Sequence, residues 1–170
     1  VMILTGSRIE FVISMLACVR MGAVALPMNP QLTAADLAFR VSATNPSLAI
    51  GESRYLKNLG SGVPALDMDD LARIFDEDLD QATPAKAARL DPGDPALIVF
   101  TSGSTGDPQP NFKHWGPLVE DMRGEMRRLG VGPGHTILGT VPPQHMFGFE
   151  SPVLLPLLSG AALTAERPYY

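Results

Sequence analysis

The feature that most constrains the fold is an apolar run, residues 96–100, that passes directly into a loop of glycines and hydroxyl side chains. The run is rich in β-branched and large apolar residues and predicts a buried strand. The loop consists of Thr101, Ser102, Gly103, Ser104, Thr105 and Gly106. Because glycine lets the backbone approach a ligand and successive N–H groups bind anions, the stretch predicts a phosphate-binding loop at a strand end. The alternative is an ordinary Ser/Gly surface turn.

The better-known nucleotide loops do not fit this stretch. A P-loop has more widely spaced glycines followed by Lys and Ser/Thr. Here Gly103 and Gly106 are three positions apart and precede Asp107-Pro108. The dinucleotide fingerprint G-x-G-x-x-G and the esterase elbow G-x-S-x-G are also absent. These mismatches argue against a small unrelated nucleotide hydrolase.

The exact sequence of the loop is a more specific signal. The string Phe100-Thr-Ser-Gly-Ser-Thr-Gly-Asp-Pro108 resembles the phosphate-loop signature of the adenylate-forming ligases, the acyl-CoA synthetase and luciferase superfamily. The opening also resembles that family, in Gly22-Ala-Val-Ala-Leu-Pro-Met-Asn-Pro30 and the helix after it. The resemblance covers the chain from about Leu4 onward and is weakest over residues 52–90. It implies that residues 101–106 wrap the β- and γ-phosphates of ATP.

The chain departs from the family pattern directly after the loop. The family usually continues Pro-Lys-Gly, whereas Gln109-Pro110 follows Pro108 here, and the nearest basic residue is Lys113. We expect the proline-rich continuation to form a loop that swings Lys113 towards the γ-phosphate. The alternative is a surface lysine with Trp115 packing beside it. The continuation itself resembles an offshoot of the family found with bacterial aryl-polyene and related pigment pathways.

Alternating strand and helix patterns predict an α/β fold. Strands are expected at residues 1–4, 23–26 and 47–50, with helices between them. A Ser7/Glu10 capping box begins the first helix, and Gly22 ends it. Thr33 caps the second helix. This order predicts parallel strands in β-α-β layers, the N-terminal part of the large domain of an acyl-CoA synthetase-like fold. The apolar residues expected to form the buried face of the first helix are Ile9, Val12, Ile13, Leu16 and Val19.

The chain divides near residue 95. Residues 1–95 are expected to form a first α/β subdomain with an acidic linker near 60–95, and residues 96–170 the phosphate-loop strand and the start of a second, incomplete subdomain. Asp76, Asp78 and Asp80 resemble the opening of a calcium loop, but Gln81 stands where that loop needs Gly and Ala87 where it needs Glu. A solvated linker is therefore preferred to a metal site.

The second part of the chain predicts a helix over 117–129, a strand over 136–141, a helix over 147–158 and a strand over 161–165. The residues expected on the buried face of the 117–129 helix are Leu118, Met122, Met126 and Leu129.

A second constellation follows the 136–141 strand. Pro142, His145 and Gly148 keep the Pro-x-x-His-x-x-Gly spacing that the family has at this point. Open α/β sheets bind ligands at the carboxyl ends of their strands. The resemblance implies that His145, Phe147 and Gly148 line the acyl-substrate pocket. The alternative is a loop histidine with no role, which is how we interpret His114 and His135.

Composition excludes several other classes. The net charge is −5, with no basic patch for nucleic acid. No apolar run reaches the roughly 18 residues of a membrane span, and no signal peptide is visible. Cys18 is the sole cysteine and lies in an apolar helical pattern. It predicts a buried, inert thiol and a reducing, cytoplasmic setting.

The resemblance implies an ATP-dependent carboxylate-activating ligase. Such an enzyme forms an acyl-adenylate from a small carboxylic acid and ATP, with Mg²⁺, and passes the acyl group to a thiol on coenzyme A or a phosphopantetheine carrier protein. The chain does not begin with Met and looks cut from a longer protein, so we expect it to be inactive alone, and no catalytic or metal-binding residue is assigned within it. The alternative is a truncated, non-catalytic homologue that acts as a nucleotide- or protein-binding module.

Overall fold

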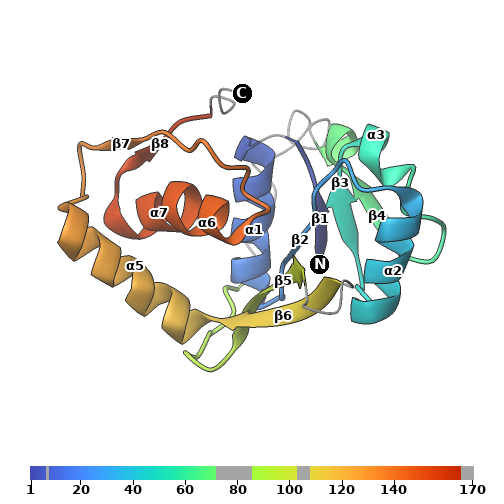
Figure 1. Ribbon diagram of the computed structural model, residues 1–170, viewed down its shortest axis with the longest axis horizontal. Helices are drawn as coiled ribbons and strands as arrows, with labels where there is room; N and C mark the ends of the chain where they lie inside the picture. Colours follow the sequence, from blue (N-terminus) through green and yellow to red (C-terminus); the bar gives the residue numbers. More distant parts are fainter. Residues whose placement is uncertain (7, 72–85, 103–107, 166–170) are drawn as a thin grey trace.

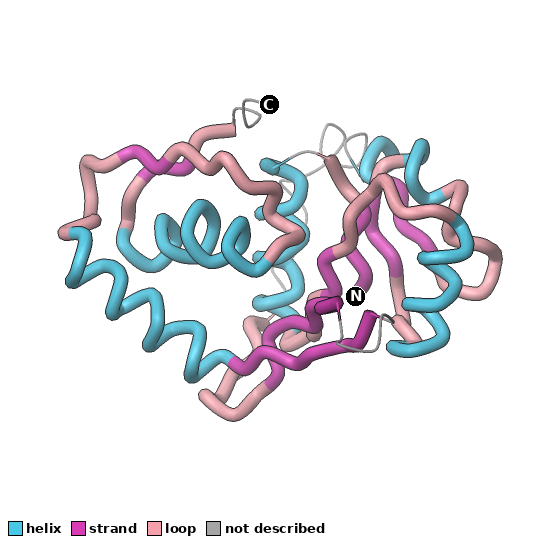
Figure 2. Tube along the Cα trace, viewed as in Figure 1, coloured by secondary structure: helices cyan, strands magenta, loops and turns pink. Residues whose placement is uncertain are grey.

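The structure is a computed structural model that describes residues 1–6, 8–71, 86–102 and 108–165. Figure 1 shows two lobes, one built on a parallel sheet and one built mainly of helices, with helix α1 between them. A hairpin of two long strands runs along one edge and joins the lobes (Figure 2). None of the helices in the described part of the chain is long and apolar enough to cross a membrane.

The first lobe confirms the predicted parallel α/β arrangement. Its sheet has the order β2-β1-β3-β4, and every pairing in it is parallel. The strands are β1 (Met2–Leu4), β2 (Leu26–Pro27), β3 (Ala49–Gly51) and β4 (Ala65–Asp67). The helices are α1 (Arg8–Met21), α2 (Ala34–Thr44) and the short α3 (Ser53–Leu56). Side chains of β1 alternate between two cores, because Ile3 packs with α1 while Met2 and Leu4 pack with Leu37 of α2.

Local signals set the helix ends, and the predicted ones at Thr33 and Gly22 are confirmed. The Thr33 side chain accepts a hydrogen bond from the Asp36 amide at the start of α2, and Asn45 ends that helix in the left-handed region at φ 44°. Gly22 follows α1 at φ +67°. Glu10 lies in the first turn of α1, whereas Ser7, the other half of the predicted capping box, lies outside the described residues.

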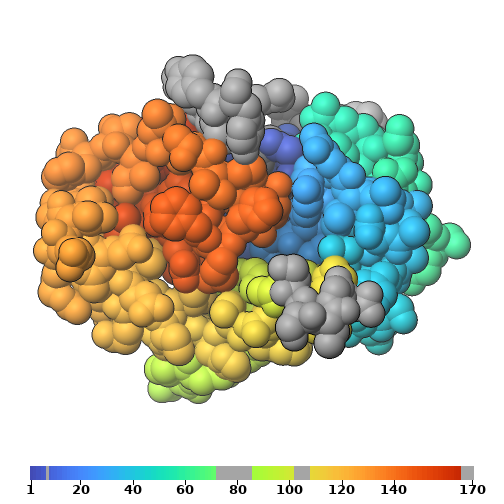
Figure 3. Space-filling view, in the orientation of Figure 1, coloured from blue at the N-terminus to red at the C-terminus, as the bar shows by residue number. Residues whose placement is uncertain are grey.

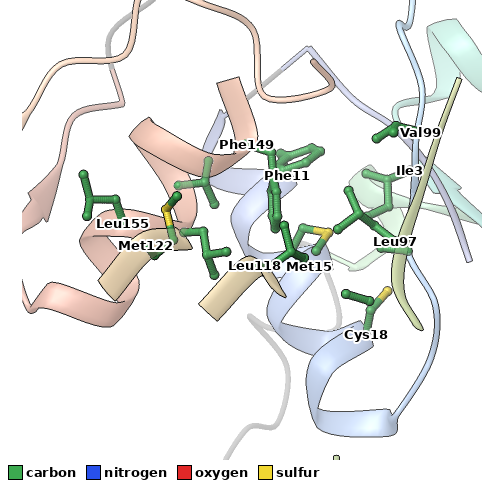
Figure 4. Close-up of a cluster of buried hydrophobic side chains, with 14 residues drawn as sticks. Ile3, Phe11, Met15, Cys18, Leu97, Val99, Leu118, Met122, Phe149 and Leu155 are labelled. Atoms are coloured by element: carbon green, nitrogen blue, oxygen red, sulfur yellow. The ribbon is translucent and has the colours of Figure 1, made fainter. Parts of the chain in front are cut away.

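The predicted buried face of α1 is wrong. Phe11, Met15 and Cys18 are buried, whereas Ile9, Ile13 and Leu16 are 56, 47 and 46% exposed. Val12 and Val19 are half-buried. Helix α1 is apolar on nearly every side, so spacing alone does not choose its buried face. The packing partners choose it: Figure 4 shows Phe11 against Phe149 of the second lobe, with Met15 and Cys18 lower on the same helix.

The hairpin consists of β5 (Pro95–Ser102) and β6 (Pro108–His114), which pair antiparallel along their whole length. The predicted strand over 96–100 is confirmed, but the predicted loop after Pro108 is wrong because those residues form β6. Proline is tolerated on an edge strand, where the missing N–H removes no ladder bond. The Ile98 amide donates to the Ala25 carbonyl at 2.8 Å, which ties β5 to the first lobe.

The second lobe follows the hairpin. It contains α5 (Trp115–Leu129), β7 (Thr136–Ile137), α6 (Met146–Phe149), the π-helical turn η2 (Glu150–Leu154), α7 (Leu155–Ser159) and β8 (Ala162–Leu163). The expected strands are present but shorter, and β7 pairs parallel with β8. Leu118 and Met122 are buried and Met126 half-buried as expected, but Leu129 is 62% exposed at the last turn of α5.

The predicted helix over 147–158 is present but contains a π turn. The Leu155 amide donates to the Glu150 carbonyl, five residues back. Pro152 and Pro156 carry no N–H, so the regular α-helical ladder is interrupted on both sides of this bond. The lobe packs on α1 through one apolar cluster that contains residues from both sides of position 95, such as Met15 and Leu118.

Candidate functional site

The hairpin presents its open end next to the first lobe. Thr101 and Ser102 end β5, and they pair with Gln109 and Pro108, which begin β6. Thr101 and Gln109 are exposed. The structure therefore brings together the two strand ends that flank the predicted phosphate loop. Gly103, Ser104, Thr105 and Gly106, the rest of that prediction, lie outside the described residues.

A cation lies beside this end of the hairpin that the sequence analysis did not single out. The Arg40 guanidinium on α2 stacks over the Phe100 ring, with its carbon 5.1 Å from the ring centroid. The Arg40 side chain is only 12% exposed, and its Nη1 donates to the Asp36 carbonyl at 3.0 Å. The i, i+4 spacing of Asp36 and Arg40 was a visible signal, but it gave no hint of contact with a strand sixty residues away along the chain.

The structure does not bring Lys113 to the open end of the hairpin. Lys113 pairs with Leu97 near the base, while Pro108 pairs with Ser102 at the open end. At about 3.4 Å per residue, the five-residue separation along β6 is on the order of 17 Å. The Lys113 charge acts instead on Glu150 of η2. Burial and the charges of Asp121 and Glu125 raise the pKa of Glu150, and the Lys113 charge partly offsets this rise.

Trp115 stabilises the base of the hairpin. It begins α5 and packs against the central apolar cluster, and its amide donates to the Asp94 carbonyl at 3.1 Å. This placement agrees with Trp115 as a structural anchor. Gly116 follows it with no room for a side chain, since a Cβ there would lie 2.9 Å from the Pro92 carbonyl oxygen.

The segment after β7 forms a tight turn that ends at His145. The His145 amide donates to the Pro142 carbonyl at 3.1 Å, and the His145 carbonyl accepts from the Phe149 amide at 2.8 Å. The imidazole is exposed and does not cap α6. Gly148 is buried, and a Cβ on it would lie 2.0 Å from the Pro142 carbonyl oxygen. Only glycine fits there, so Gly148 shapes the turn rather than lining a pocket.

Phe147 points away from the core and is 62% exposed. It lines an apolar groove of about 410 Å³ between α5, β7 and the π turn. Neither His145 nor Gly148 lines this groove, so of the three predicted acyl-side residues only Phe147 borders it. The groove residues are Glu125, Arg128, Leu129, Val131, Ile137, Phe147, Ser151 and Leu155. Figure 3 shows a separate hollow between the two lobes, with the blue N-terminal segment at its bottom.

Two further predictions concern reactive groups. Cys18 is a buried free cysteine, and burial raises the pKa of its thiol, which agrees with an inert residue. Within the described ranges, no group of three His, Cys, Asp or Glu side chains could hold a metal ion. Asp76, Asp78 and Asp80 of the calcium-like stretch lie outside those ranges.

Comparison with known families decides the class of the chain. The family described as AMP-binding enzyme matches residues 1–168. The chain belongs to the AMP-binding enzyme family. The family includes the adenylate-forming ligases that the loop signature resembles, so the resemblance noted in the sequence is confirmed.

Curated relatives of this AMP-binding chain include two kinds of protein. Phosphinothricin tripeptide synthetase PhsB from Streptomyces viridochromogenes is 31% identical over 163 residues, which cover 94% of this chain and 13% of the synthetase. 4-Coumarate–CoA ligase 1 from Arabidopsis thaliana is 29% identical over 184 residues, which cover 96% of this chain and 33% of the ligase. The chain therefore spans about a third or less of the length of these relatives.

Solved structures share the fold of this AMP-binding chain. O-succinylbenzoate coenzyme A synthetase (MenE) from Bacillus subtilis, in complex with ATP and magnesium ion, aligns with a TM-score of 0.84 at 20% identity, over 99% of this chain and 44% of that one. VinN aligns with a TM-score of 0.85 at 24% identity, over 95% of this chain and 42% of that one. These likenesses confirm the predicted α/β fold class.

Proposed function

We propose that the protein to which this chain belongs is an ATP-dependent carboxylate-activating ligase. In the first step a carboxylate oxygen attacks the α-phosphorus of ATP, the bond to the bridging oxygen breaks, and pyrophosphate leaves with that electron pair. In the second step a thiolate attacks the acyl carbonyl and AMP leaves. The observation that carries the proposal is the signature loop at the open end of the β5–β6 hairpin, in a chain matched by the AMP-binding family from residue 1 to 168.

The open end of the hairpin is the proposed phosphate side. Thr101 and Ser102 supply hydroxyl groups and backbone N–H groups at the strand end, and residues 103–106 continue the loop. Polyphosphate charge must also be offset by a cation. Gln109 cannot do this, and the register keeps Lys113 at the other end of the hairpin. Arg40, already stacked on Phe100, is the cation that we assign to this role in place of the usual lysine.

The turn after β7 is the proposed acyl side. The exposed His145 ring approaches the acid, and Phe147, two residues later, is exposed as well. Gly148 contributes by allowing the close contact with Pro142 that sets the turn. This assignment follows from the family resemblance and from the position of residues 142–148 after β7, a parallel strand.

ATP fits the residue types at this end of the hairpin, where the exposed Thr101 ends β5 and the Arg40 guanidinium stacks on the preceding residue, Phe100. Mg²⁺ would supply charge neutralisation at the phosphates when bound, and its proposed use rests on the ATP and magnesium ion named for the MenE complex. The acceptor is a thiol, on coenzyme A or a carrier protein, since the relatives include both a CoA ligase and a peptide synthetase. A cytoplasmic location and an aryl-polyene or related pigment pathway complete the proposal.

An ATP–pyrophosphate exchange assay on the full-length protein tests the proposal, with a panel of aryl and fatty acids. At least one acid should support exchange, and Gly103→Val should reduce it by about a hundredfold or more because the side chain blocks backbone approach to phosphate. Gly62→Val is the matched control, since a Cβ at Gly62 meets nothing within 4 Å. Residues 1–170 alone should not exchange. Equal exchange by the two variants would contradict the phosphate assignment.

A second candidate, a non-catalytic nucleotide- or protein-binding module, is favoured by one observation. Gln109 stands in β6 where the family usually has lysine. Nucleotide binding by the full-length protein without exchange for any acid would support this candidate over the ligase.

A further inference from the structure

Arg8 is a buried charged residue that joins the two lobes. It begins α1 and is only 6% exposed. Its Nη2 donates to the Gly139 carbonyl at 2.8 Å and its Nη1 to the Thr164 carbonyl at 3.2 Å, across 131 and 156 positions of sequence. Gly139 follows β7 and Thr164 follows β8, so one guanidinium holds the carboxyl ends of both strands.

Burying a guanidinium costs free energy, and its hydrogen bonds to the two carbonyls offset that cost. Desolvation lowers the pKa of Arg8, although a guanidinium stays charged. Its Nε is buried with no hydrogen-bond partner in the described structure. Removing the side chain would leave two carbonyls at the strand ends without their charged donor.

Packing confines the same point of the chain from both sides. A Cβ on Gly139 would lie 2.4 Å from the Pro152 Cβ and 2.8 Å from Arg8 Nη1. Gly139 is therefore held between α1 and the π turn. Pro142 comes three residues later and is fixed in turn by the His145 amide and by the close approach of Gly148.

We propose that Arg8 is a positioning residue, which holds the segment from Gly139 to His145 in place relative to the first lobe and so aligns the acyl side with the phosphate side. The proposal rests on the proposed function for its effect on catalysis. Its structural part, the fixing of residues 139–145 by Arg8, can be measured without any activity. Arg8 touches neither reacting group and acts through His145.

The first test is amide hydrogen exchange in the full-length protein carrying Arg8→Met. Exchange of peptides over residues 138–149 should become about tenfold faster, since a charge-assisted hydrogen bond that holds this segment is lost. Peptides over β1 and β5 should change less than about twofold. Arg8→Lys should give a smaller increase, because an ammonium can reach one carbonyl but does not present the guanidinium fork. Arg123→Met, which removes an exposed arginine paired with Glu120, is the matched control.

The second test measures KM for the acid and KM for ATP separately in the ATP–pyrophosphate exchange assay. Arg8→Met should raise KM for the acid by about tenfold with KM for ATP within about twofold, because only the acyl side moves. Equal changes in both constants, or faster hydrogen exchange over the whole chain, would show a general structural role and overturn the proposal. An unchanged KM for the acid would overturn it as well.

A second variant keeps the proposal testable if Arg8→Met does not fold. Gly139→Ala disturbs the same contact from the other side, and it should reproduce faster hydrogen exchange over residues 138–149 with β1 unchanged. Uniform loss of protection in this variant would contradict the proposal. Because hydrogen exchange needs no substrate, a failure of the ligase proposal and a failure of the Arg8 proposal give different results.

Discussion

The two sides of the proposed site are held by different kinds of interaction. The hairpin that leads to the phosphate loop is fixed by a backbone ladder from Leu97 to Ser102 and by its bond to Ala25 of the first lobe. The segment that carries His145 is fixed at a few points, by Arg8 at Gly139 and by Gly148 at Pro142. A ladder distributes its energy over many bonds, whereas a turn held at a few points depends on each of them. Single substitutions should therefore damage the acyl side more than the hairpin.

The largest expected effect is at Gly148. Gly148→Ala places a Cβ 2.0 Å from the Pro142 carbonyl oxygen, and both groups belong to the backbone of one tight turn. Because neither can move without opening the turn, we expect a loss of about 3 kcal/mol in the free energy of unfolding. Urea unfolding of the wild type and the variant measures this.

Gly62→Ala is the matched control for that experiment, since a Cβ there meets nothing within 4 Å and the backbone is not in the left-handed region. Its free energy of unfolding should change by less than about 0.5 kcal/mol. Similar stabilities for the two variants would mean that the turn relaxes freely and that the contrast between ladder and turn is wrong.

The second effect separates Arg40 from Lys113 on the hairpin side. Arg40→Met should raise KM for ATP about tenfold in the full-length protein, with KM for the acid nearly unchanged, because one charged contact to phosphate is removed. The cation–π contact with Phe100 is worth about 2 kcal/mol at this largely buried position, less than a typical total stability, so the fold should survive. Lys113→Ala should leave both constants within about twofold. A larger effect of Lys113 on ATP would restore the expectation made from the sequence.

The contrast between ladder and turn also explains which features could be predicted. The signals that set helix ends, such as Thr33 and Gly22, act within a few residues and were visible in the sequence. Strand β6 was missed because two prolines argue against a strand, and only its edge position permits them. The buried face of α1 was assigned wrongly because its partner, Phe149, lies far along the chain. Arg40 and Arg8 act on Phe100 and Gly139 through contacts that no local spacing encodes.

The third effect concerns the side chain that the turn presents. His145→Ala removes an exposed imidazole that makes no cap to α6, so the stability should change by less than about 0.5 kcal/mol. KM or kcat for the acid should change by about five- to tenfold, with KM for ATP unaffected, if the ring lies on the acyl side. His135→Ala is the control on another exposed loop histidine. Equal effects of the two variants would leave His145 without a role.

The smallest effect lies between the two sides, at Glu150 of the π turn. Burial and the charges of Asp121 and Glu125 raise the pKa of Glu150, and Lys113 opposes them. A carboxyl with a higher pKa in the folded than in the unfolded state binds more protons when folded. The free energy of unfolding therefore falls as the pH rises from the ordinary glutamate pKa, about 4.3, through the raised one. Above that pH window the ionised Glu150 destabilises the folded state to the full extent, and protonation of the carboxyl removes this destabilisation.

Glu150→Gln should therefore stabilise the protein at pH 7, by less than about 1 kcal/mol because the side chain is partly solvated and its repulsions are screened. The gain should disappear below about pH 4, where Glu150 is protonated in both states. Lys113→Ala should have the opposite sign at pH 7, since it leaves the repulsion among the three carboxylates unopposed. Glu120→Gln is the control, because it removes a surface ion pair with Arg123 and should not stabilise. Urea unfolding of each variant across this pH range measures the effect, and a loss of stability for Glu150→Gln at pH 7 would place Lys113 and Glu150 in a stabilising ion pair at the base of the hairpin.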